Sequence, residues 1–251
     1  MLVHAARIAL GPILYAQARR LRTSALQLPE PSGPRQGVEG AGQTCLRLLV
    51  TGDSSAAGVG AETQDDALAR PLARDLALRL GARIEWNLVA QSGVNSEQLL
   101  HLIRGATAAR ADIAIVIVGV NDVTGEVPLG RALRWRAEIT AWLLSQAQAR
   151  QVLFTSMPEM QRFPLIPQPL AWYAGMHARR NNAAQARWAR SLSNVGHIDL
   201  SGFVRPEWMA RDGFHPAPPL YARLATRIGE QVAARTRAQC FVDLPAPLRN
   251  R

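Results

Sequence analysis

A serine and an aspartate–histidine pair are the residues of this chain best suited to nucleophilic chemistry. Ser54 follows Gly52-Asp53 at the end of an apolar run, and His215 stands three residues after Asp212 in a loop with glycine and proline. A serine hydroxyl is a poor nucleophile until a base takes its proton during the attack. Of the five histidines only His215 has an aspartate at that spacing. We therefore expect His215 to be the base and Asp212 to orient its ring and stabilise the imidazolium.

Two further segments carry groups that could bind a developing negative charge. Gly93 follows Gln91-Ser92, and Asn121 lies in Gly119-Val120-Asn121-Asp122. Attack on an ester creates a tetrahedral oxyanion that needs preorganised hydrogen-bond donors. A glycine lets its backbone N–H approach a substrate closely, and an asparagine supplies a side-chain amide. Taken singly, Gly93 fits an ordinary strand-to-helix turn and Asn121 an Asx turn. Asp53 and Asp122 are interpreted as carboxylates that order these loops.

Together these segments resemble the four motif blocks of the GDSL/SGNH hydrolases. Gly52-Asp53-Ser54, Gly93, Gly119-x-Asn121-Asp122 and Asp212-x-x-His215 occur in the family's order, and the resemblance covers about residues 45–237. It implies a flavodoxin-like fold and a serine esterase or lipase that works through an acyl-enzyme on Ser54. It also implies an oxyanion hole made by the backbone N–H groups of Ser54 and Gly93 and the side-chain amide of Asn121.

Two positions next to the serine qualify the resemblance. Ser55 stands where the family name has leucine, at a position that varies within the family. Ala56 replaces the second glycine of a Gly-x-Ser-x-Gly elbow, which argues against an ordinary α/β-hydrolase.

The elements that must position these groups alternate between short apolar runs and segments with helical periodicity. The apolar runs predict strands at 46–51, 84–89, 112–118, 151–155 and 197–200. The periodic segments predict helices at 66–80, 96–108, 129–149, 170–192 and 220–235. Strict alternation predicts a three-layer α/β/α sandwich with a five-stranded parallel sheet. In such sheets ligands bind beyond the carboxyl ends of the strands, where the four blocks stand.

The composition of the chain excludes several kinds of structural and cofactor site. The chain has 251 residues, a formal net charge of +10, 48% hydrophobic residues and two cysteines, Cys45 and Cys240. Two distant cysteines exclude a disulfide framework and a cysteine zinc site. No His, Asp or Glu grouping has metal-ligand spacing and no glycine-rich phosphate loop is present, so we expect no metal and no cofactor.

The positive charge comes entirely from arginine. Arginines such as Arg131, Arg134 and Arg136 are scattered on predicted helix faces, which is typical of a solvated surface. We therefore expect no nucleic-acid partner. The alternative from another class is a non-catalytic, arginine-rich protein that binds a membrane surface or nucleic acid. The combination of Ser54, Asp212 and His215 argues against it, because a binding module has no use for all three.

The N-terminal segment decides the expected organisation and location. Residues 1–44 divide into a basic, apolar segment (1–26) and a Pro/Gly-rich linker (28–44), followed by the hydrolase domain (45–237) and a C-terminal tail (238–251). We expect 1–26 to form an amphipathic helix that packs on the domain or makes a peripheral contact with a membrane surface, in a cytoplasmic enzyme. The alternative is an exported protein with residues 1–18 as a signal peptide.

The substrate is expected to be a small carboxylic ester. Alternatives on the same site are a carbohydrate O-deacetylase and a thioesterase or lysophospholipase. Residues 157–170 hold four prolines together with Phe163, Leu165 and Ile166. This segment could form the wall of an acyl pocket or pack on the core, and the sequence favours neither.

Overall fold

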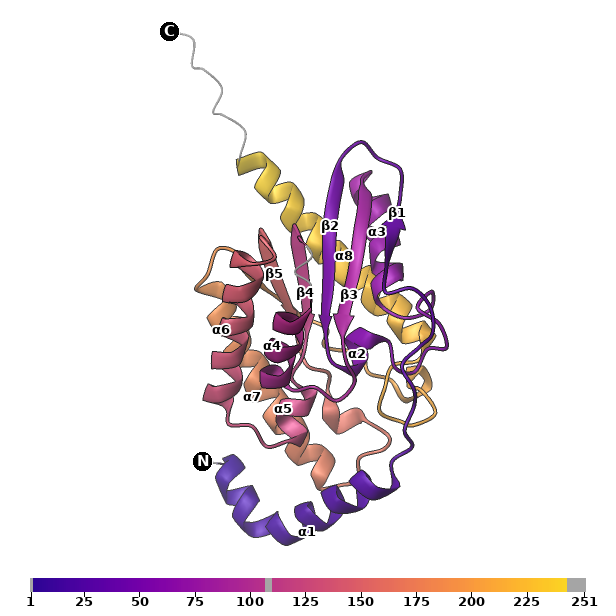
Figure 1. Ribbon diagram of the computed structural model, residues 1–251. Coiled ribbons are helices and arrows are strands. Elements are labelled where there is room, and N and C mark those ends of the chain that lie inside the picture. Colours follow the sequence, from indigo (N-terminus) through magenta and orange to yellow (C-terminus); the bar gives the residue numbers. More distant parts are fainter. Residues whose placement is uncertain (1, 107–109, 243–251) are drawn as a thin grey trace.

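Runs of apolar and β-branched residues form the sheet at the centre of the molecule (Figure 1). The computed structural model describes residues 2–106 and 110–242. In this part of the chain the strands are β1 (Gln36–Glu39), β2 (Cys45–Gly52), β3 (Arg83–Ala90), β4 (Ile113–Ile117), β5 (Gln151–Thr155) and β6 (Val195–Ile198). Their order across the sheet is β1-β3-β2-β4-β5-β6. All neighbours are parallel except β1 and β3.

Helices connect the strands and cover both faces of the sheet (Figure 1). The described α-helices are α1 (Leu2–Ser24), α2 (Ser54–Ala57), α3 (Ala69–Leu80), α4 (Ser96–Gly105), α5 (Val120–Thr124), α6 (Leu129–Ser145), α7 (Leu170–Arg190) and α8 (Pro218–Val242). Two 3₁₀ turns are η1 (Met160–Arg162) and η2 (Pro206–Trp208). All five predicted helices are present. α4 ends at Gly105 and α6 at Ser145, before the predicted ends at 108 and 149, and residue 108 itself lies outside the described residues; α8 continues beyond the predicted end at 235.

The sheet separates two hydrophobic cores, and the side chains of β2 point alternately into one and the other. Leu48 and Val50 pack with residues of α3 and α8, whereas Leu49 between them packs with residues of α4 and α6 on the other face. Successive side chains of a strand point to opposite faces, so a strand that is apolar throughout must be covered twice. The predicted three-layer α/β/α sandwich is confirmed.

The five predicted parallel strands are present as β2 to β6, but the described sheet has a sixth strand, β1, that was not predicted. β1 lies in the segment predicted to be an irregular linker, and it pairs antiparallel with β3 from Gln36↔Asn87 to Glu39↔Ile84. Four residues that include one glycine and one β-branched residue give too weak a strand pattern to stand out among prolines and glycines. The sheet therefore begins before residue 45. Of the tail predicted at 238–251, residues 238–242 continue α8, and 243–251 lie outside the described residues.

The N-terminal segment forms helix α1 and packs on α7. Leu14 is buried against Tyr173 and Met176. The Gln17 side chain donates to the backbone carbonyl of Gln168 (2.7 Å) and accepts from the backbone N–H of Leu170 (3.1 Å). The expectation that this helix packs on the domain is thus confirmed. Within the described residues no helix combines the length and hydropathy that crossing a bilayer requires. Contact with a membrane surface and cleavage after residue 18 stay predictions.

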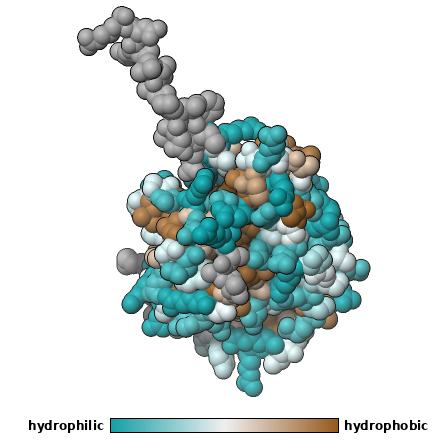
Figure 2. All heavy atoms as spheres, turned by 45° about the horizontal axis from the view of Figure 1, so that its top comes forward, coloured by the Kyte–Doolittle hydropathy of each residue, from teal (hydrophilic) through white to brown (hydrophobic). Residues whose placement is uncertain are grey.

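Polar side chains dominate the surface seen in Figure 2, where hydrophobic residues are interspersed among hydrophilic ones. Arg131 and Arg134 are exposed on α6, as their helical positions predicted. Arg136, on the same helix, is not.

Two leucines of α3 provide a direct test of this packing. Leu72 is 0% exposed in the core between α3, α8 and the sheet, whereas Leu78 is 86% exposed. Leu72→Ala removes buried apolar surface and leaves a cavity, so we expect it to lower the free energy of unfolding by about 2–5 kcal/mol. Leu78→Ala is the matched control and should change it by less than about 0.5 kcal/mol. Urea denaturation measures both, and equal effects would contradict the described packing.

Candidate active site

The structure brings Ser54, His215 and Asp212 into one hydrogen-bonded chain. Ser54 begins α2 immediately after β2, and His215 Nε2 lies 2.9 Å from its Oγ. On the other side of the ring, His215 Nδ1 lies 2.5 Å from Asp212 Oδ2. A hydroxyl, an imidazole and a carboxylate in this order match a nucleophile, a base and the group that orients the base.

The loop that carries His215 is held by its own backbone and by aromatic packing. Asp212 Oδ1 accepts hydrogen bonds from the backbone N–H groups of Phe214 (2.9 Å) and His215 (3.0 Å). The Phe214 ring stands edge-on to both the His215 ring and the Phe163 ring, each at 5.1 Å between centroids. The imidazole is therefore fixed by contacts on several sides.

Phe163 belongs to the proline-rich segment for which the sequence left two roles open. Met157, Met160, Phe163 and Ile166 are all buried in one cluster with residues of α7. The segment also supports the histidine loop, because the Leu165 backbone N–H donates to the Gly213 carbonyl (3.1 Å). These four side chains pack as core, and Phe163 supports the histidine loop through Phe214.

The three predicted oxyanion donors lie at the ends of three adjacent strands. Ser54 follows β2, Gly93 follows β3, and Asn121 is in α5 after β4. Gly93 has φ +82°, a conformation that L side chains rarely adopt, and apart from its two chain neighbours no described residue lies within 4 Å of the place a Cβ would take. The Asn121 amide donates to the Val94 carbonyl (2.9 Å), next to Gly93. An NH₂ group has two hydrogens, so one donor remains for a ligand.

Glu30 and Arg35, in the segment predicted as a linker, brace the loop of Gly93. Glu30 Oε1 accepts a hydrogen bond from the Ser92 backbone N–H (2.6 Å), and Arg35 donates to the Ala90 carbonyl (2.9 Å). This support was not predicted, because nothing in a Pro/Gly-rich segment marks a single carboxylate as a loop brace.

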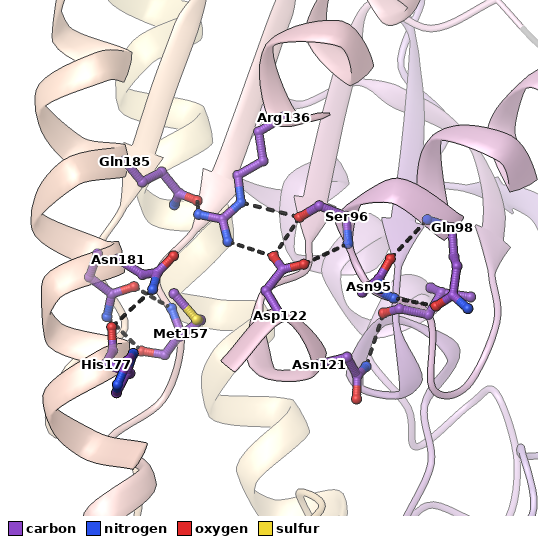
Figure 3. Close-up of polar contacts among 12 residues, drawn as sticks. Asn95, Ser96, Gln98, Asn121, Asp122, Arg136, Met157, His177, Asn181 and Gln185 are labelled. Atoms are coloured by element: carbon purple, nitrogen blue, oxygen red, sulfur yellow. Dashed lines mark hydrogen bonds and ion pairs between the residues drawn. The ribbon is translucent and has the colours of Figure 1, made fainter. Parts of the chain in front are cut away.

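The sequence also did not predict a buried ion pair that lies beside Asn121, one of the predicted oxyanion donors (Figure 3). Arg136 Nη2 lies 2.9 Å from Asp122 Oδ2, and the two side chains are 0% and 1% exposed. The interpretation of Arg136 as a solvated arginine is wrong. The position of Arg136 along the helix could have indicated its burial, because Arg136 lies on the same face of α6 as other buried residues: Ala132, Ile139, Thr140 and Leu143.

The remaining sequence candidates have structural contacts. Asp53 caps α2 by accepting from the Ser55 backbone N–H (3.0 Å), and Asp122 orders the start of α4, as their interpretation as loop-ordering carboxylates predicted. Of the other histidines, His197 contacts Gln185 and His177 packs on Tyr173. The side chain of His4 lies outside the described residues.

Burial and hydrogen bonding shift the two site carboxyls in opposite directions. Burial alone would raise the pKa of Asp212, but hydrogen bonds from His215 and Phe214 outweigh it and lower that pKa below its usual value. Asp212 is therefore ionised and suited to stabilise an imidazolium. Burial raises the pKa of Asp53 to about 7, and none of the described residues that affect this pKa is a cation. Among the described residues no group of three or more His, Cys, Asp or Glu is placed to hold a metal ion.

An α/β sandwich with a serine–histidine–aspartate chain at its carboxyl edge is the arrangement of an ester hydrolase. Residues 50–223 match the model of the GDSL-like lipase/acylhydrolase family, and the chain belongs to this family. The predicted resemblance is confirmed.

Relatives and solved structures agree with this membership. A GDSL-like esterase of Mycobacterium tuberculosis is 27% identical over 188 residues, 72% of this chain and 59% of that protein. The chain thus matches less than two thirds of that relative. A lipase from a goat rumen metagenome is similar with a TM-score of 0.59 and 16% identity, over 75% of this chain and 97% of that one. A carbohydrate acetylesterase of Sinorhizobium meliloti has a TM-score of 0.58 and 17% identity, over 76% and 99%. At these identities the two structures show a shared fold.

The raised pKa of Asp53 predicts a specific pH dependence of stability. The folded state keeps the Asp53 proton up to about pH 7, whereas an unfolded chain loses it near its ordinary pKa of 3.8. Stability should therefore fall as pH rises through this window. Asp53→Asn stays neutral and can still cap Ser55, so its stability relative to wild type should rise with pH, by at most about 1.4 kcal/mol per pH unit.

Melting temperatures of both proteins between pH 4 and pH 8 check this expectation. Because every other titrating group is shared, the difference between the two curves isolates Asp53. Parallel curves would show that Asp53 is ionised in the folded protein throughout the range.

Proposed function

We propose that the protein is a serine esterase that hydrolyses small carboxylic esters through an acyl-enzyme on Ser54. The observation that carries the proposal is the unbroken chain from Asp212 through His215 to the Ser54 hydroxyl, with distances of 2.5 Å and 2.9 Å. Family membership supports the same reaction class. A structural role would not require all three groups to be aligned at the carboxyl edge of the sheet.

In the proposed reaction His215 carries out every proton transfer. His215 Nε2 takes the Ser54 proton as Oγ attacks the ester carbonyl, and Asp212 stabilises the resulting imidazolium through Nδ1. Collapse of the tetrahedral intermediate breaks the bond to the alcohol, which receives the proton from His215 as it leaves. A water molecule then attacks the acyl-enzyme, with His215 again as base, and releases the acid and free Ser54.

Three donors would bind the oxyanion of each intermediate. These are the backbone N–H groups of Ser54 and Gly93 and the second N–H of the Asn121 amide. Each donor follows one of three adjacent strands. The hydrogen bond from Asn121 to the Val94 carbonyl links the loop of Asn121 to the loop of Gly93. Donors fixed before the reaction stabilise developing charge without the cost of reorganisation.

A second candidate is an O-deacetylase that acts on acetylated carbohydrate. The burial of Met157, Met160, Phe163 and Ile166 favours it, because these side chains are unavailable to line a long acyl groove. An acetyl group needs no such groove. Both candidates use the same serine chemistry and differ in the alcohol that leaves.

Ser54→Ala should abolish hydrolysis of both a chromogenic acetate ester and an acetylated oligosaccharide. It should also abolish covalent labelling by a fluorophosphonate, which reacts only with an activated serine, while the circular dichroism spectrum stays unchanged. The adjacent Ser55→Ala is the matched control and should keep both activity and labelling. Labelling that persists in Ser54→Ala would move the nucleophile to another residue.

Asn121→Ala should reduce kcat by roughly 10²–10³-fold and leave KM nearly unchanged, because the lost donor acts mainly in the transition state. Loss of its bond to Val94 should also lower stability by about 1 kcal/mol. Asn181→Ala removes a similar bond, from a side-chain amide to the His177 carbonyl (3.0 Å) on α7, and should cost stability alone. If kcat survives in Asn121→Ala while the melting temperature falls, Asn121 only orders its loop.

A further inference from the structure

The spacing of two proposed oxyanion donors depends on contacts between separate loops. Gly93 precedes α4 and Asn121 lies in α5. The Asp122 carboxylate joins these loops, because Oδ1 accepts from the Ser96 backbone N–H (2.9 Å) and Oδ2 accepts from the Ser96 hydroxyl (2.6 Å). Ser96 is the first residue of α4, so this bridge links the start of α4 to the residue beside Asn121.

Arg136 contacts both sides of this bridge and ties it to a third element (Figure 3). Its Nη2 donates to Asp122 Oδ2 (2.9 Å), and its Nε lies 3.4 Å from the Ser96 hydroxyl. Its Nη1 donates to the side-chain oxygen of Gln185 (2.9 Å), which in turn donates to the Thr155 carbonyl at the end of β5 (3.0 Å). The guanidinium thus connects α4, α5, α6 and α7 through one planar group.

The backbone that leads to Asn121 is shaped around this guanidinium. Gly119 has φ +139°, and a Cβ there would stand 2.9 Å from Arg136 Nη2 and 2.8 Å from the Met157 sulfur. The turn before α5 therefore lies directly against the guanidinium. A shift of the guanidinium toward this turn would displace the backbone that leads to Asn121.

Stability alone does not account for a buried pair of this kind. Replacing both partners of a buried ion pair by apolar residues is often neutral or stabilising, whereas removing one partner leaves an uncompensated charge. What a guanidinium and a carboxylate add is fixed geometry, because the planar donor fork sets both distance and direction.

We propose that Arg136 is a positioning residue for ester hydrolysis: through Asp122 and Ser96 it holds Gly93 and Asn121 at the separation that the oxyanion requires. The inference rests on the proposed function. Arg136 does not touch the reacting atoms, so its effect is on the alignment of the donors.

The test compares Arg136→Met with the double variant Arg136→Met/Asp122→Asn. The single variant leaves an unpaired buried carboxylate and should melt at a lower temperature, whereas the double variant removes that charge and should recover melting temperature. In both, kcat should fall at least tenfold while KM stays within threefold. Affinity for an arylboronic acid, whose tetrahedral adduct on Ser54 mimics the intermediate, should fall in parallel with kcat.

A second arginine–aspartate pair provides the control. Arg47 bonds Asp112 at 3.0 Å and 3.1 Å near the amino ends of β2 and β4, at the opposite edge of the sheet. Arg47→Met and Arg47→Met/Asp112→Asn should change melting temperature and leave kcat within twofold. Should both Arg136 variants fail to fold, Arg136→Lys and Ser96→Ala provide the same comparison, since each keeps a compensated Asp122 but loses part of the network.

The results separate two kinds of failure. If kcat of the folded Arg136 variants stays within threefold of wild type, or recovers with melting temperature in the double variant, Arg136 is only structural and the inference is wrong. If wild type hydrolyses no ester, or Ser54→Ala remains active, the proposed function is wrong and the inference falls with it. Loss of kcat in the Arg136 variants, with Ser54 essential and the Arg47 variants active, supports both.

Discussion

The parallel pairing of β2 with both β3 and β4 is the constraint on which the site depends. Gly52 is paired with Ala90 on one side and with Ile117 on the other, so the carboxyl ends of three strands stop at the same level. Ser54, Gly93 and Asn121 follow these paired positions closely in sequence. Neighbouring strands lie about 4.8 Å apart, which sets how far the three loops start from one another. The chemistry of the site begins with this register.

Buried polar side chains hydrogen-bond the loops that follow these strands and fix their positions more closely than the strand register does. Arg136 compensates the charge of the Asp122 carboxylate, whereas Asp212 is stabilised by hydrogen bonds from His215 and from the backbone N–H of Phe214. Burial raises the pKa of Asp53, and among the described residues no cation offsets this effect. The pKa values of Asp212 and Asp53, two buried carboxyls at the same end of the sheet, are thus shifted in opposite directions by what stands next to each.

Periodicity and motif order in the sequence were sufficient to predict the layers, five of the strands and the residues that meet at Ser54. They succeeded because the runs of β2, β4 and β5 are apolar and mostly buried, because β3 alternates buried with less buried residues, and because each block stands close behind a strand or in the loop before the last helix. They failed for β1, whose four residues carry little strand propensity, and for Glu30, whose contact lies far away in sequence. Arg136 was missed for a different reason: charge was given more weight than its place on the buried stripe of α6.

Strand β1 also has a consequence for the solubility of the chain. It covers part of the outer edge of β3, a strand of eight residues. An uncovered edge presents unpaired N–H and C=O groups to other chains and favours association. The span that matches the family begins at residue 50, within β2. A protein trimmed to that span would lose β1, most of β2 and the Glu30 brace, and would expose the backbone of β3 to intermolecular pairing.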